Sequence, residues 1–427
     1  MYFIKKLDNG IQVVLEKIGN INSISLGVIV DNGSINEIKI NNGISHFIEH
    51  MLFRGTNNKT SKQISEIIDK IGGNLNAYTS KENTGFYAQI LPEHLEITID
   101  LLSDMMINPL FNEEDIEKEK SIIEEEINMY LDDPEDLVHE LLNETIYANT
   151  SLEMPILGNL HSIKSFNNIM LKQYFQDHYN VENIIISIAG NIDIEETYKN
   201  LDYYFADTPR ASKKKENIFH KEKNKLFNKI KGLNRDIEQF NLCIGLPGVS
   251  SYSQELYEYL ILSNILANNE SSRLYQSIRE AGFAYSIYSS ITSYRDKGDM
   301  AIYMGLNNTN IDHTLSLIDK EFYKLLNEDI SKEEIELGKE QIKINYILES
   351  ENSLSKMFEN AKSFSLFGKI ETQKEILEKI EKVNKTSMKT IVLKTFNREY
   401  INVSYVTSLK DKININQQIN NKIFRGD

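Results

Sequence analysis

The sequence predicts an α+β protein made of two homologous α/β-sandwich-like units, each an antiparallel-rich sheet covered by helices. Two observations predict this fold. The chain has 427 residues, and at roughly 100–200 residues per domain such a length accommodates two to four domains. Segments typical of strands and helices also follow one another in the order strand, helix, helix, strand, strand, and this order occurs once in each half of the chain.

The first unit is expected to cover residues 1–212. Its elements in chain order are two strands within 1–17, a strand at 22–30, helices at 44–54 and 61–71, strands at 74–80 and 85–91, a helical region at 93–145 and a buried strand at 181–193. Asn9-Gly10 forms the turn between the first two strands. In the helix at 61–71, Ser61 is expected to cap the start and Gly72 to end it.

The second unit is expected to cover residues 233–427. Its elements are a strand at 240–248, helices at 254–267 and 271–281, and strands at 283–290 and 299–306. Between the units, residues 213–232 are rich in lysine and show little hydrophobic periodicity, as is typical of a solvated linker rather than a binding patch. Aligned by eye, "LILSN" in the second unit occupies the place of "HFIEH" in the first, so metal-binding groups are expected only in the first.

Composition excludes several classes of protein. The net charge of -16 argues against a nucleic-acid binder, which usually carries a basic face. The single cysteine, Cys243, permits no intrachain disulfide and is expected to be a core residue of an apolar strand. No apolar run approaches the roughly 18 residues of a membrane helix. The first residues lack the apolar core of a signal peptide, so we expect cytoplasmic residence and no membrane partner.

The segment "GISHFIEHMLFRGT" (43–56) places two histidines and a glutamate in an apolar helix. At about 100° per residue, His46 and His50 share one face and Glu49 lies on the same side. The other directions of the helix are covered by Phe47, Ile48, Met51 and Leu52. A helix that is apolar on its other sides is buried, and buried ionisable groups need partners.

A zinc ion is the partner that this spacing favours, since two imidazoles at i and i+4 can share one Zn²⁺. Glu49 is badly placed to bind the metal beside both histidines, and it suits a general base acting on water. The competing interpretation is a pair of hydrogen-bonded core histidines beside a chance glutamate. The order H-x-x-E-H in an apolar helix favours zinc, and it is the inverzincin motif.

A catalytic zinc typically has three protein ligands, so a third ligand must come from elsewhere. The acidic segment 113–130 offers candidates, and its apolar face is marked by Ile116, Ile123, Ile127 and Tyr130. Glu119 and Glu126 fall within that face, two turns apart, whereas Glu124 and Glu125 point away from it. One of the two should reach the metal and the other should support it from behind. Periodicity alone leaves both assignments open.

Five segments together resemble the pitrilysin/insulinase family of zinc peptidases, in particular its short branch related to mitochondrial processing peptidase. They are "GISHFIEHMLFRGT", "GGNLNAYTSKENTGFYA", "EKEKSIIEEEINMYLDDP", "PILGNLHSI" and "SSRLYQSIREAGFAYSIYSS", and they extend over most of residues 5–405. The resemblance implies a zinc metalloendopeptidase. It implies that His46, His50 and Glu126 bind the metal and that Glu49 is the base.

The resemblance also assigns roles to residues outside the metal set. It implies that Glu119 supports the metal from the second shell. It implies that Asn76 and Ala77 lie on an edge strand to which an extended substrate adds. From the second unit it implies Arg279 and Tyr285 as residues that contact substrate near the scissile bond. This chain reads "REAGFAY", so the two lie six positions apart where the family has seven, and one residue is missing from the turn.

Long members of the family place four such units in one chain, folded as two halves around a closed chamber. This chain has two units, so the resemblance implies half of that clamshell. A homodimer is therefore expected, with Arg279 and Tyr285 acting at the partner's zinc site, and a heterodimer is the alternative. Substrates are expected to be peptides or unfolded segments. The alternative function is a non-catalytic peptide-binding subunit of a heterodimeric family peptidase.

Overall fold

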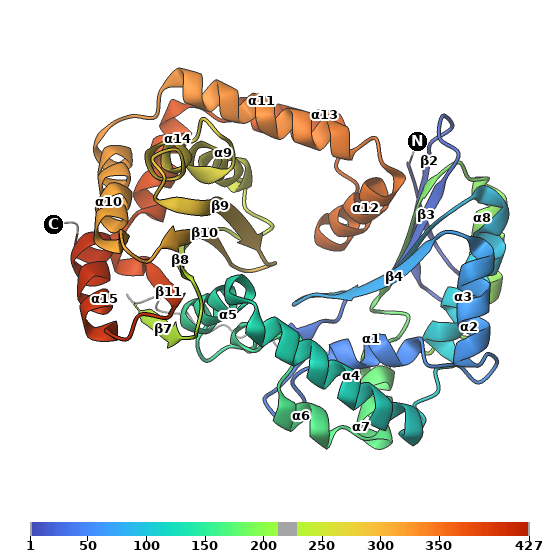
Figure 1. Ribbon diagram of the computed structural model, residues 1–427. Helices are drawn as coiled ribbons and strands as arrows, with labels where there is room; N and C mark the ends of the chain where they lie inside the picture. The colour runs from blue at the N-terminus through green and yellow to red at the C-terminus, as the bar shows by residue number, and fades with distance from the viewer. Residues whose placement is uncertain (1, 212–228, 426–427) are drawn as a thin grey trace. The chain divides into compact units, whose positions relative to one another are not determined.

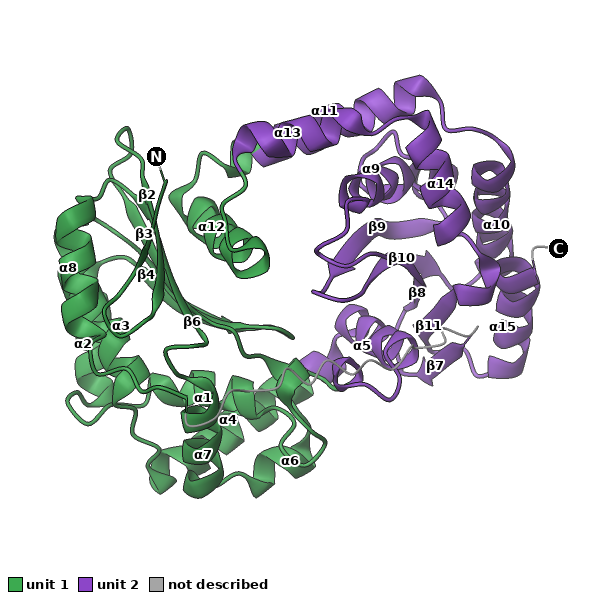
Figure 2. Ribbon diagram, turned by 180° about the vertical axis from the view of Figure 1, so that it is seen from behind, with its two compact units in different colours: residues 1–129, 154–220, 347–371 green, residues 130–153, 221–346, 372–427 purple. Residues whose placement is uncertain are grey.

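A computed structural model of the chain describes residues 2–211 and 229–425 (Figure 1). The chain forms two compact units, each with one sheet and its own covering helices (Figure 2). Among the described residues the first unit comprises 2–129, 154–211 and 347–371, and the second comprises 130–153, 229–346 and 372–425. The predicted α+β fold with two helix-covered sheets is confirmed. Most of the predicted linker 213–232 lies outside the described residues.

The sheet of the first unit has six strands in the order β1-β2-β6-β3-β5-β4. The strands are β1 Tyr2–Lys6, β2 Gln12–Lys17, β3 Ile24–Val30, β4 Asn74–Thr79, β5 Thr84–Ile90 and β6 Ile184–Gly190. Only the β2–β6 pair is parallel, and all other neighbours are antiparallel. β3 is buried along its whole length, as expected for a central strand covered on both faces.

Helices cover both faces of this sheet. They are α1 Ile44–Leu52, α2 Ser61–Ile71, α3 Leu95–Ile107, α6 Leu160–Ser165, α7 Asn168–His178, α8 Ile194–Tyr204 and α12 Ser353–Phe367, with most of α4 Glu113–Asp132 and the short 3₁₀ turns Ser34–Asn36 and Pro92–His94. Figures 1 and 2 both show α12 on one face of the sheet, and α2, α3 and α8 on the other. α1 packs against β4 and β5, near the edge of the sheet.

The sheet of the second unit has five strands in the order β7-β11-β8-β10-β9. The strands are β7 Ile230–Asn234, β8 Gln239–Pro247, β9 Ala284–Ser293, β10 Gly298–Asn307 and β11 Asn402–Thr407. Here the β7–β11 pair is parallel and the other neighbours are antiparallel. If β7 is matched to β2, the second sheet repeats the first strand for strand, without an equivalent of β1.

The helices of the second unit are α5 Pro134–Ile146, α9 Leu256–Ala267, α10 Ile311–Asn327, α13 Gln373–Lys382, α14 Lys385–Thr395 and α15 Lys412–Ile419, with most of α11 Lys332–Glu349. Two π-helices, η4 Tyr275–Arg279 and η6 Asn420–Arg425, and the 3₁₀ turns Ser151–Glu153 and Arg398–Tyr400 complete it. α5 packs on β7, β8 and β11, and α9 packs on β9 and β10.

Each sheet has a glycine where a helix crosses it closely. A Cβ on Gly27 of β3 would lie 2.3 Å from Met357 Sδ of α12, and a Cβ on Gly245 of β8 would lie 2.6 Å from Ile146 Cδ1 of α5. Beside each contact, a serine of the neighbouring strand donates to a helix carbonyl: Ser187 to Met357 O, and Ser404 to Val138 O, both at 2.7 Å. The two units therefore bind their covering helices in the same way.

Two details differ from the sequence predictions. Thr60, not Ser61, caps α2, because its hydroxyl accepts from the Gln63 N–H while the Gln63 side chain accepts from the Thr60 N–H, a complete capping box. The predicted helix at 271–281 is largely a π-helix. Gly72 ends α2 at φ 62, as predicted. Among the described residues, no helix combines the length and apolar character needed to cross a bilayer.

Candidate metal centre

The helix that carries the histidines begins without a side-chain cap of its own. Its N-cap residue, Gly43, has φ 92, and its Cα packs against Gly158 so closely that a Cβ would lie 2.8 Å from the Gly158 Cα. The buried carboxylate of Glu37 accepts instead from the Gly43 N–H at 2.7 Å and from the Ser45 N–H at 2.9 Å. A carboxylate at a helix N-terminus satisfies unpaired N–H groups and complements the helix dipole.

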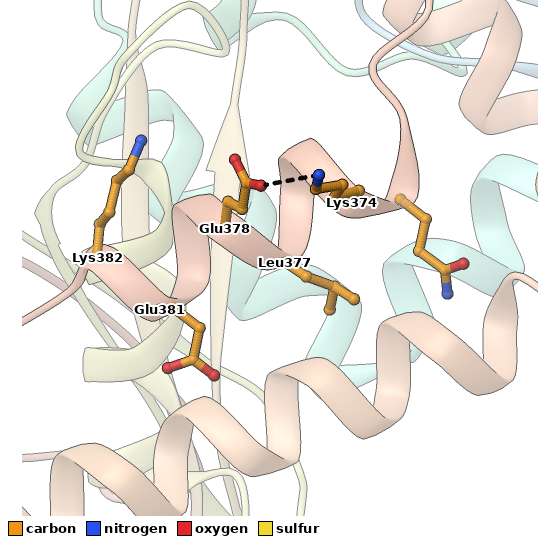
Figure 3. Close-up of a pocket in the computed structure, with 6 residues that line it drawn as sticks. Lys374, Leu377, Glu378, Glu381 and Lys382 are labelled. Atoms are coloured by element: carbon orange, nitrogen blue, oxygen red, sulfur yellow. Dashed lines mark ion pairs between the residues drawn. The ribbon is translucent and has the colours of Figure 1, made fainter.

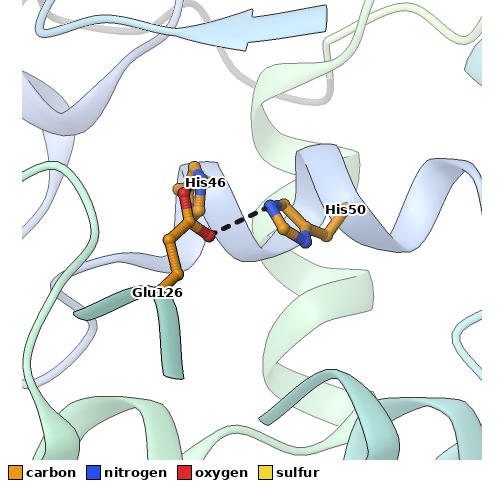
Figure 4. A group of neighbouring side chains, drawn as sticks. All are labelled: His46, His50 and Glu126. Atoms are coloured by element: carbon orange, nitrogen blue, oxygen red, sulfur yellow. Dashed lines mark ion pairs between the residues drawn. The ribbon is translucent and has the colours of Figure 1, made fainter. Parts of the chain in front are cut away.

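His46, His50 and Glu126 converge on one point (Figure 4). The histidines project from α1, one turn apart, and Glu126 reaches them from α4. Glu126 Oε1 lies 3.6 Å from His46 Nε2, and its Oε2 lies 3.6 Å from His50 Nε2. Tetrahedral zinc with bonds of about 2.0–2.1 Å holds neighbouring ligand atoms about 3.4 Å apart. The spacing therefore fits a zinc ion, and a ligand atom from each residue lies within 4.8 Å of the other two.

The protonation of His46 also suits a metal ligand. Burial, followed by the charge of His50, lowers the pKa of His46 to about 3, so its ring is neutral near neutral pH. His46 Nδ1 is buried and has no hydrogen-bond partner among the described residues. The polar contact of this ring is made through Nε2, on the side of Glu126. Zinc binds the neutral form of imidazole, and Nε2 of His46 lies on the side of Glu126, where the ion would be held.

His50 is held from behind by a carboxylate. Its Nδ1 lies 2.8 Å from Glu119 Oε1, and Glu119 Oε2 accepts from Arg54 Nε. Burial works against the protonated ring, but the hydrogen bond and charge of Glu119, with the charges of Glu126 and Glu49, outweigh it and raise the pKa of His50. In Glu119 burial raises the carboxyl pKa, but the bonds from His50 and Arg54 leave it below its ordinary value. This contact fixes the ring so that Nε2 faces Glu126.

Glu49 follows His46 and precedes His50 on α1 but is not one of the three converging groups. Its Oε2 accepts a hydrogen bond from the hydroxyl of Thr79, the last residue of β4. Burial is the largest influence on this carboxyl group and raises the pKa of Glu49, although the Thr79 hydrogen bond and the charge of His50 oppose it. A carboxylate with a raised pKa, placed beside a metal site, can take and return a proton.

The negative charge of this cluster exceeds the positive charge that contacts it. Glu49, Glu119 and Glu126 face the two histidines, whereas Arg54 is the cation that the structure bonds to the carboxylates. Partly buried like charges repel strongly unless a cation compensates them. A divalent metal between the histidines and Glu126 would supply that compensation.

The predicted substrate strand lies at the edge of the first sheet. β4 pairs with β5 on one side, and no strand of the described chain pairs with its outer side. Asn76 is exposed and Ala77 is half-buried. The Ala77 N–H donates to the side chain of Asn76 at 2.8 Å rather than to a neighbouring strand. This edge is therefore open to an added strand.

Arg279 and Tyr285 lie in the second unit, on a segment whose backbone is irregular twice. Arg279 ends the π-helix, whose i to i−5 hydrogen bonding is seen where the N–H of the C-cap residue Glu280 donates to Tyr275 O at 3.0 Å. In the following strand, Ala284 pairs with Leu306 and Ser286 with Gly305, so Tyr285 is the extra residue of a β-bulge. Its side chain is 58% exposed. Bulges redirect side chains, and this one leaves Tyr285 open to solvent.

Three contacts of the site were not predicted from the sequence: those of Thr79, Arg54 and Glu37. Arg54 lies four residues after His50, two residues past the end of α1, so continuing the helix phase would have placed it on the side of His50. Thr79 alternates with Ala77 along β4, and strand periodicity would have placed both on one face. Glu37 lies in a loop, and no periodic pattern indicates that its carboxylate reaches the start of α1.

A hollow on the second unit offers no comparable chemistry. It is lined by Gln373, Lys374, Leu377, Glu378, Glu381 and Lys382 of α13 (Figure 3). Two ion pairs lie at it, Lys374 with Glu378 at 3.9 Å and Glu381 with Lys343 at 2.7 Å. Within the described chain, His46, His50 and Glu126 form the single group of three side chains suited to a metal.

Comparison with known proteins agrees with this geometry. Residues 12–160 match the family model described as Insulinase (Peptidase family M16), and residues 165–342 match the model described as Peptidase M16 inactive domain. The chain is 38% identical over 396 residues to a Bacillus subtilis protein named an uncharacterized zinc protease, covering 92% of this chain and 95% of that one. A Rickettsia bellii protein of the same description is 34% identical, at 92% and 94% coverage.

Solved structures show the same fold at low sequence identity. A protease from Helicobacter pylori superposes with a TM-score of 0.88 at 18% identity, covering 95% of this chain and 99% of that one. A chain of complex III2 from Candida albicans superposes with a TM-score of 0.81 at 20% identity, at 98% and 99% coverage. The resemblance noted in the sequence is confirmed: this chain belongs to peptidase family M16, the insulinase family of zinc peptidases.

Proposed function

We propose that the protein is a zinc-dependent metalloendopeptidase that cleaves peptides or unfolded segments. The observation that carries this proposal is the convergence of His46, His50 and Glu126 beside a carboxylate, Glu49, that is not one of the ligands. Metal-assisted hydrolysis needs both parts, a three-ligand site and a nearby base. Similarity to relatives that are named zinc proteases supports the same function.

In this proposal His46, His50 and Glu126 hold the ion, and Glu119 orients His50. A zinc ion bound there supplies Lewis acidity, which activates water and polarises the scissile carbonyl. Glu49 accepts a proton from the attacking water and then delivers it to the departing amine. Asn76 and Ala77 hold the substrate backbone in extended form along β4, so that the scissile bond is presented beside Glu49.

The chelator experiment tests the activity directly. A peptide library is incubated with the zinc-loaded protein, with and without a chelator, and the cleavage products are read by mass spectrometry. We expect internal cleavages that disappear with the chelator and return when zinc is restored. Glu49→Gln should keep one zinc per chain and lose cleavage by roughly 100-fold or more, since general acid–base catalysis is worth 10²–10⁴. Undiminished cleavage by zinc-replete Glu49→Gln would refute this role for Glu49.

Arg279 and Tyr285 complete the proposal as substrate contacts in a homodimer. The exposure of Tyr285 and the bulge at that residue support a role at a surface, and Arg279 is half-buried. We propose that each subunit offers this pair to the zinc site of the other, as expected for a cytoplasmic dimer with an enclosed chamber. Mixing Glu49→Gln protein with Arg279→Ala protein tests this arrangement: some mixed dimers keep one intact site, so activity should reappear. Two inactive variants that stay inactive after confirmed subunit exchange would refute the shared site, and exchange with a second family member would identify a heterodimer.

A non-catalytic peptide-binding subunit is the alternative function. Such a protein would bind peptides along β4 without cleaving them, and the match of residues 165–342 to a domain described as inactive is compatible with it. Peptide binding by zinc-loaded wild-type protein without any cleavage would favour this alternative. The complete set His46, Glu49, His50 and Glu126 favours the enzyme.

A further inference from the structure

We propose that Thr79 is a positioning residue for the reaction: its hydroxyl holds the carboxylate of Glu49 in the orientation that faces the metal ligands. This inference rests on the proposed peptidase function. It adds a residue that the metal motif does not contain and that lies on a different element, β4, from the residue it orients on α1.

The contact is direct and specific. The Thr79 hydroxyl donates to Glu49 Oε2, and no other hydrogen bond to the Glu49 carboxylate occurs among the described residues. Its Oε1 is therefore left for a water or substrate group. A glutamate side chain has three rotatable bonds, and one donor at a fixed place selects among its rotamers.

The donor itself is held in place from three sides. Thr79 pairs with Thr84 across the β4–β5 ladder, and the turn between them is closed by the Ser80 N–H donating to Asn83 O at 2.8 Å. The loop after β3 then binds this turn, since the Ser34 N–H donates to Ser80 O at 3.1 Å and the Ile35 N–H donates to Lys81 O at 2.7 Å. The Thr79 hydroxyl therefore lies at the end of a hairpin that backbone hydrogen bonds hold in place.

Gly33, in the loop after β3, lets this loop approach the turn at residues 80–83 closely. At Gly33 a Cβ would lie 2.4 Å from Ser80 O and 2.7 Å from Asn83 N, so only a residue without a side chain lets the loop reach the turn. The chain therefore brings two backbone segments together at the hairpin end that carries Thr79. Such support is what a group needs if it is to orient a base within a fraction of an ångström.

The location of Thr79 connects the base to the substrate. The outer edge of β4 is the proposed substrate-binding edge, and Thr79 is the last residue of that strand. One rigid strand would then set the position of the scissile bond, through its backbone, and the position of the base, through one hydroxyl. Misplacing a reacting group by about 1 Å can cost roughly 100-fold in rate, so this coupling has a measurable consequence.

Three variants separate positioning from stability. Thr79→Val keeps the shape and removes the hydroxyl, Thr79→Ser keeps the hydroxyl, and Thr84→Val makes the same exchange at the opposite ladder position, where the hydroxyl donates to Asn32 O instead. We expect Thr79→Val to lower kcat roughly 10- to 100-fold with unchanged KM and zinc content, and Thr79→Ser to restore most of the rate. Thr84→Val should lower the melting temperature and keep kcat.

A second measurement does not depend on turnover. Crystal structures of zinc-loaded wild type, Thr79→Val and Thr79→Ser report the rotamer of Glu49; we expect it to change in Thr79→Val alone. An unchanged Glu49 carboxylate and kcat in Thr79→Val, or an equal loss of kcat in Thr84→Val, would overturn the positioning role. If wild type cleaves no peptide, the proposed function fails, while the Glu49 rotamer still decides the role of Thr79.

Discussion

The two units have nearly the same sheet, yet one carries the candidate metal centre and the other does not. In both, a helix packs beside the edge strand that follows it in the chain, α1 beside β4 and α9 beside β9. In both, a side chain of that helix is bonded to a hydroxyl of the edge strand: Glu49 to Thr79 in the first, and Ser263 to Ser289, at 2.8 Å, in the second. The shared fold thus supplies the place, and a few side chains supply the chemistry.

The two helices differ in the charge of the polar side chains that they bury. Ser263 and Asn264 of α9 are buried but neutral, and hydrogen bonds satisfy them, including one from Asn269 to Asn264 Oδ1 at 2.9 Å. The matching residues in α1 are Glu49 and His50, which need charged partners. Buried neutral groups cost little once they are hydrogen-bonded, whereas buried charges need an ion or a counter-charge.

The largest effect is expected when α1 receives the residue that α9 carries at the matching position. In His50→Asn, a proposed metal ligand is replaced by the amide that α9 carries at the matching position. We expect zinc content to fall from one ion per chain toward none, and peptide cleavage to fall at least roughly 1,000-fold, because a three-ligand site loses a ligand. Metal analysis and cleavage rates measure both. Asn264→Ala is the control on α9 and should keep its zinc; full zinc occupancy in His50→Asn would contradict the assignment.

The second unit also buries a carboxyl group, that of Asp299, but there the carboxyl group is compensated by holding a proton. Burial raises the pKa of Asp299 on β10 to about 6, although the Tyr147 hydroxyl donates to it. The folded state thus holds a proton that the unfolded state releases near pH 4. Stability from this group is complete below pH 4 and is lost as pH rises through 6, by about 3 kcal/mol.

Asp299→Asn tests this by removing the titration. The stability of the variant relative to wild type should rise between pH 4 and 6 and then level off, as measured by urea unfolding across that range. A difference that stays constant with pH would show that Asp299 does not titrate there.

Removing the groups that hold His50 in place should have a smaller effect than replacing His50 itself. Glu119→Gln removes the carboxylate that orients the ring, and Arg54→Met removes the cation that holds Glu119 ionised. We expect each to weaken zinc binding roughly 10- to 100-fold, as is usual for groups one step behind a ligand. Competition with a zinc chelator measures the affinity. Glu125→Gln is the matched control, since Glu125 is exposed on the same helix; equal weakening in this variant would point to a general charge effect.

Much of the fold could be predicted because its patterns are local. Short segments typical of strands marked β3, β4, β5 and β6. Helix phase brought Glu119 and Glu126 to the face of α4 that meets α1, but it could not rank them, since both lie in that face. The two glutamates differ in burial. The side chain of Glu119 is 3% exposed and lies behind His50, whereas that of Glu126 is 38% exposed and lies in front of both rings.

The remaining features depend on contacts between distant segments, which no periodic pattern records. α12 packs on the first sheet although it follows most of the second unit in the chain, and its contact depends on Gly27 and Met357. The bulge at Tyr285 is likewise set by pairing with β10, and the π-helix before it packs on β9. Propensity predicts a regular helix and strand there, and tertiary pairing decides otherwise.

The smallest expected effect comes from the hydroxyl pair of the second unit. Ser263→Ala removes the α9 counterpart of the Glu49–Thr79 contact and leaves Ser289 bonded to the Ser263 carbonyl at 2.8 Å. The Ser263 hydroxyl also accepts from Asn268 Nδ2 at 3.0 Å, so the substitution removes two hydrogen bonds. We expect a loss of about 1–2 kcal/mol in the free energy of unfolding, with kcat and zinc content unchanged. Urea unfolding and steady-state kinetics check both. A fall in kcat comparable to that of Thr79→Val would mean that the contact between helix and edge strand serves stability in both units, and that the difference between them lies in the metal ligands alone.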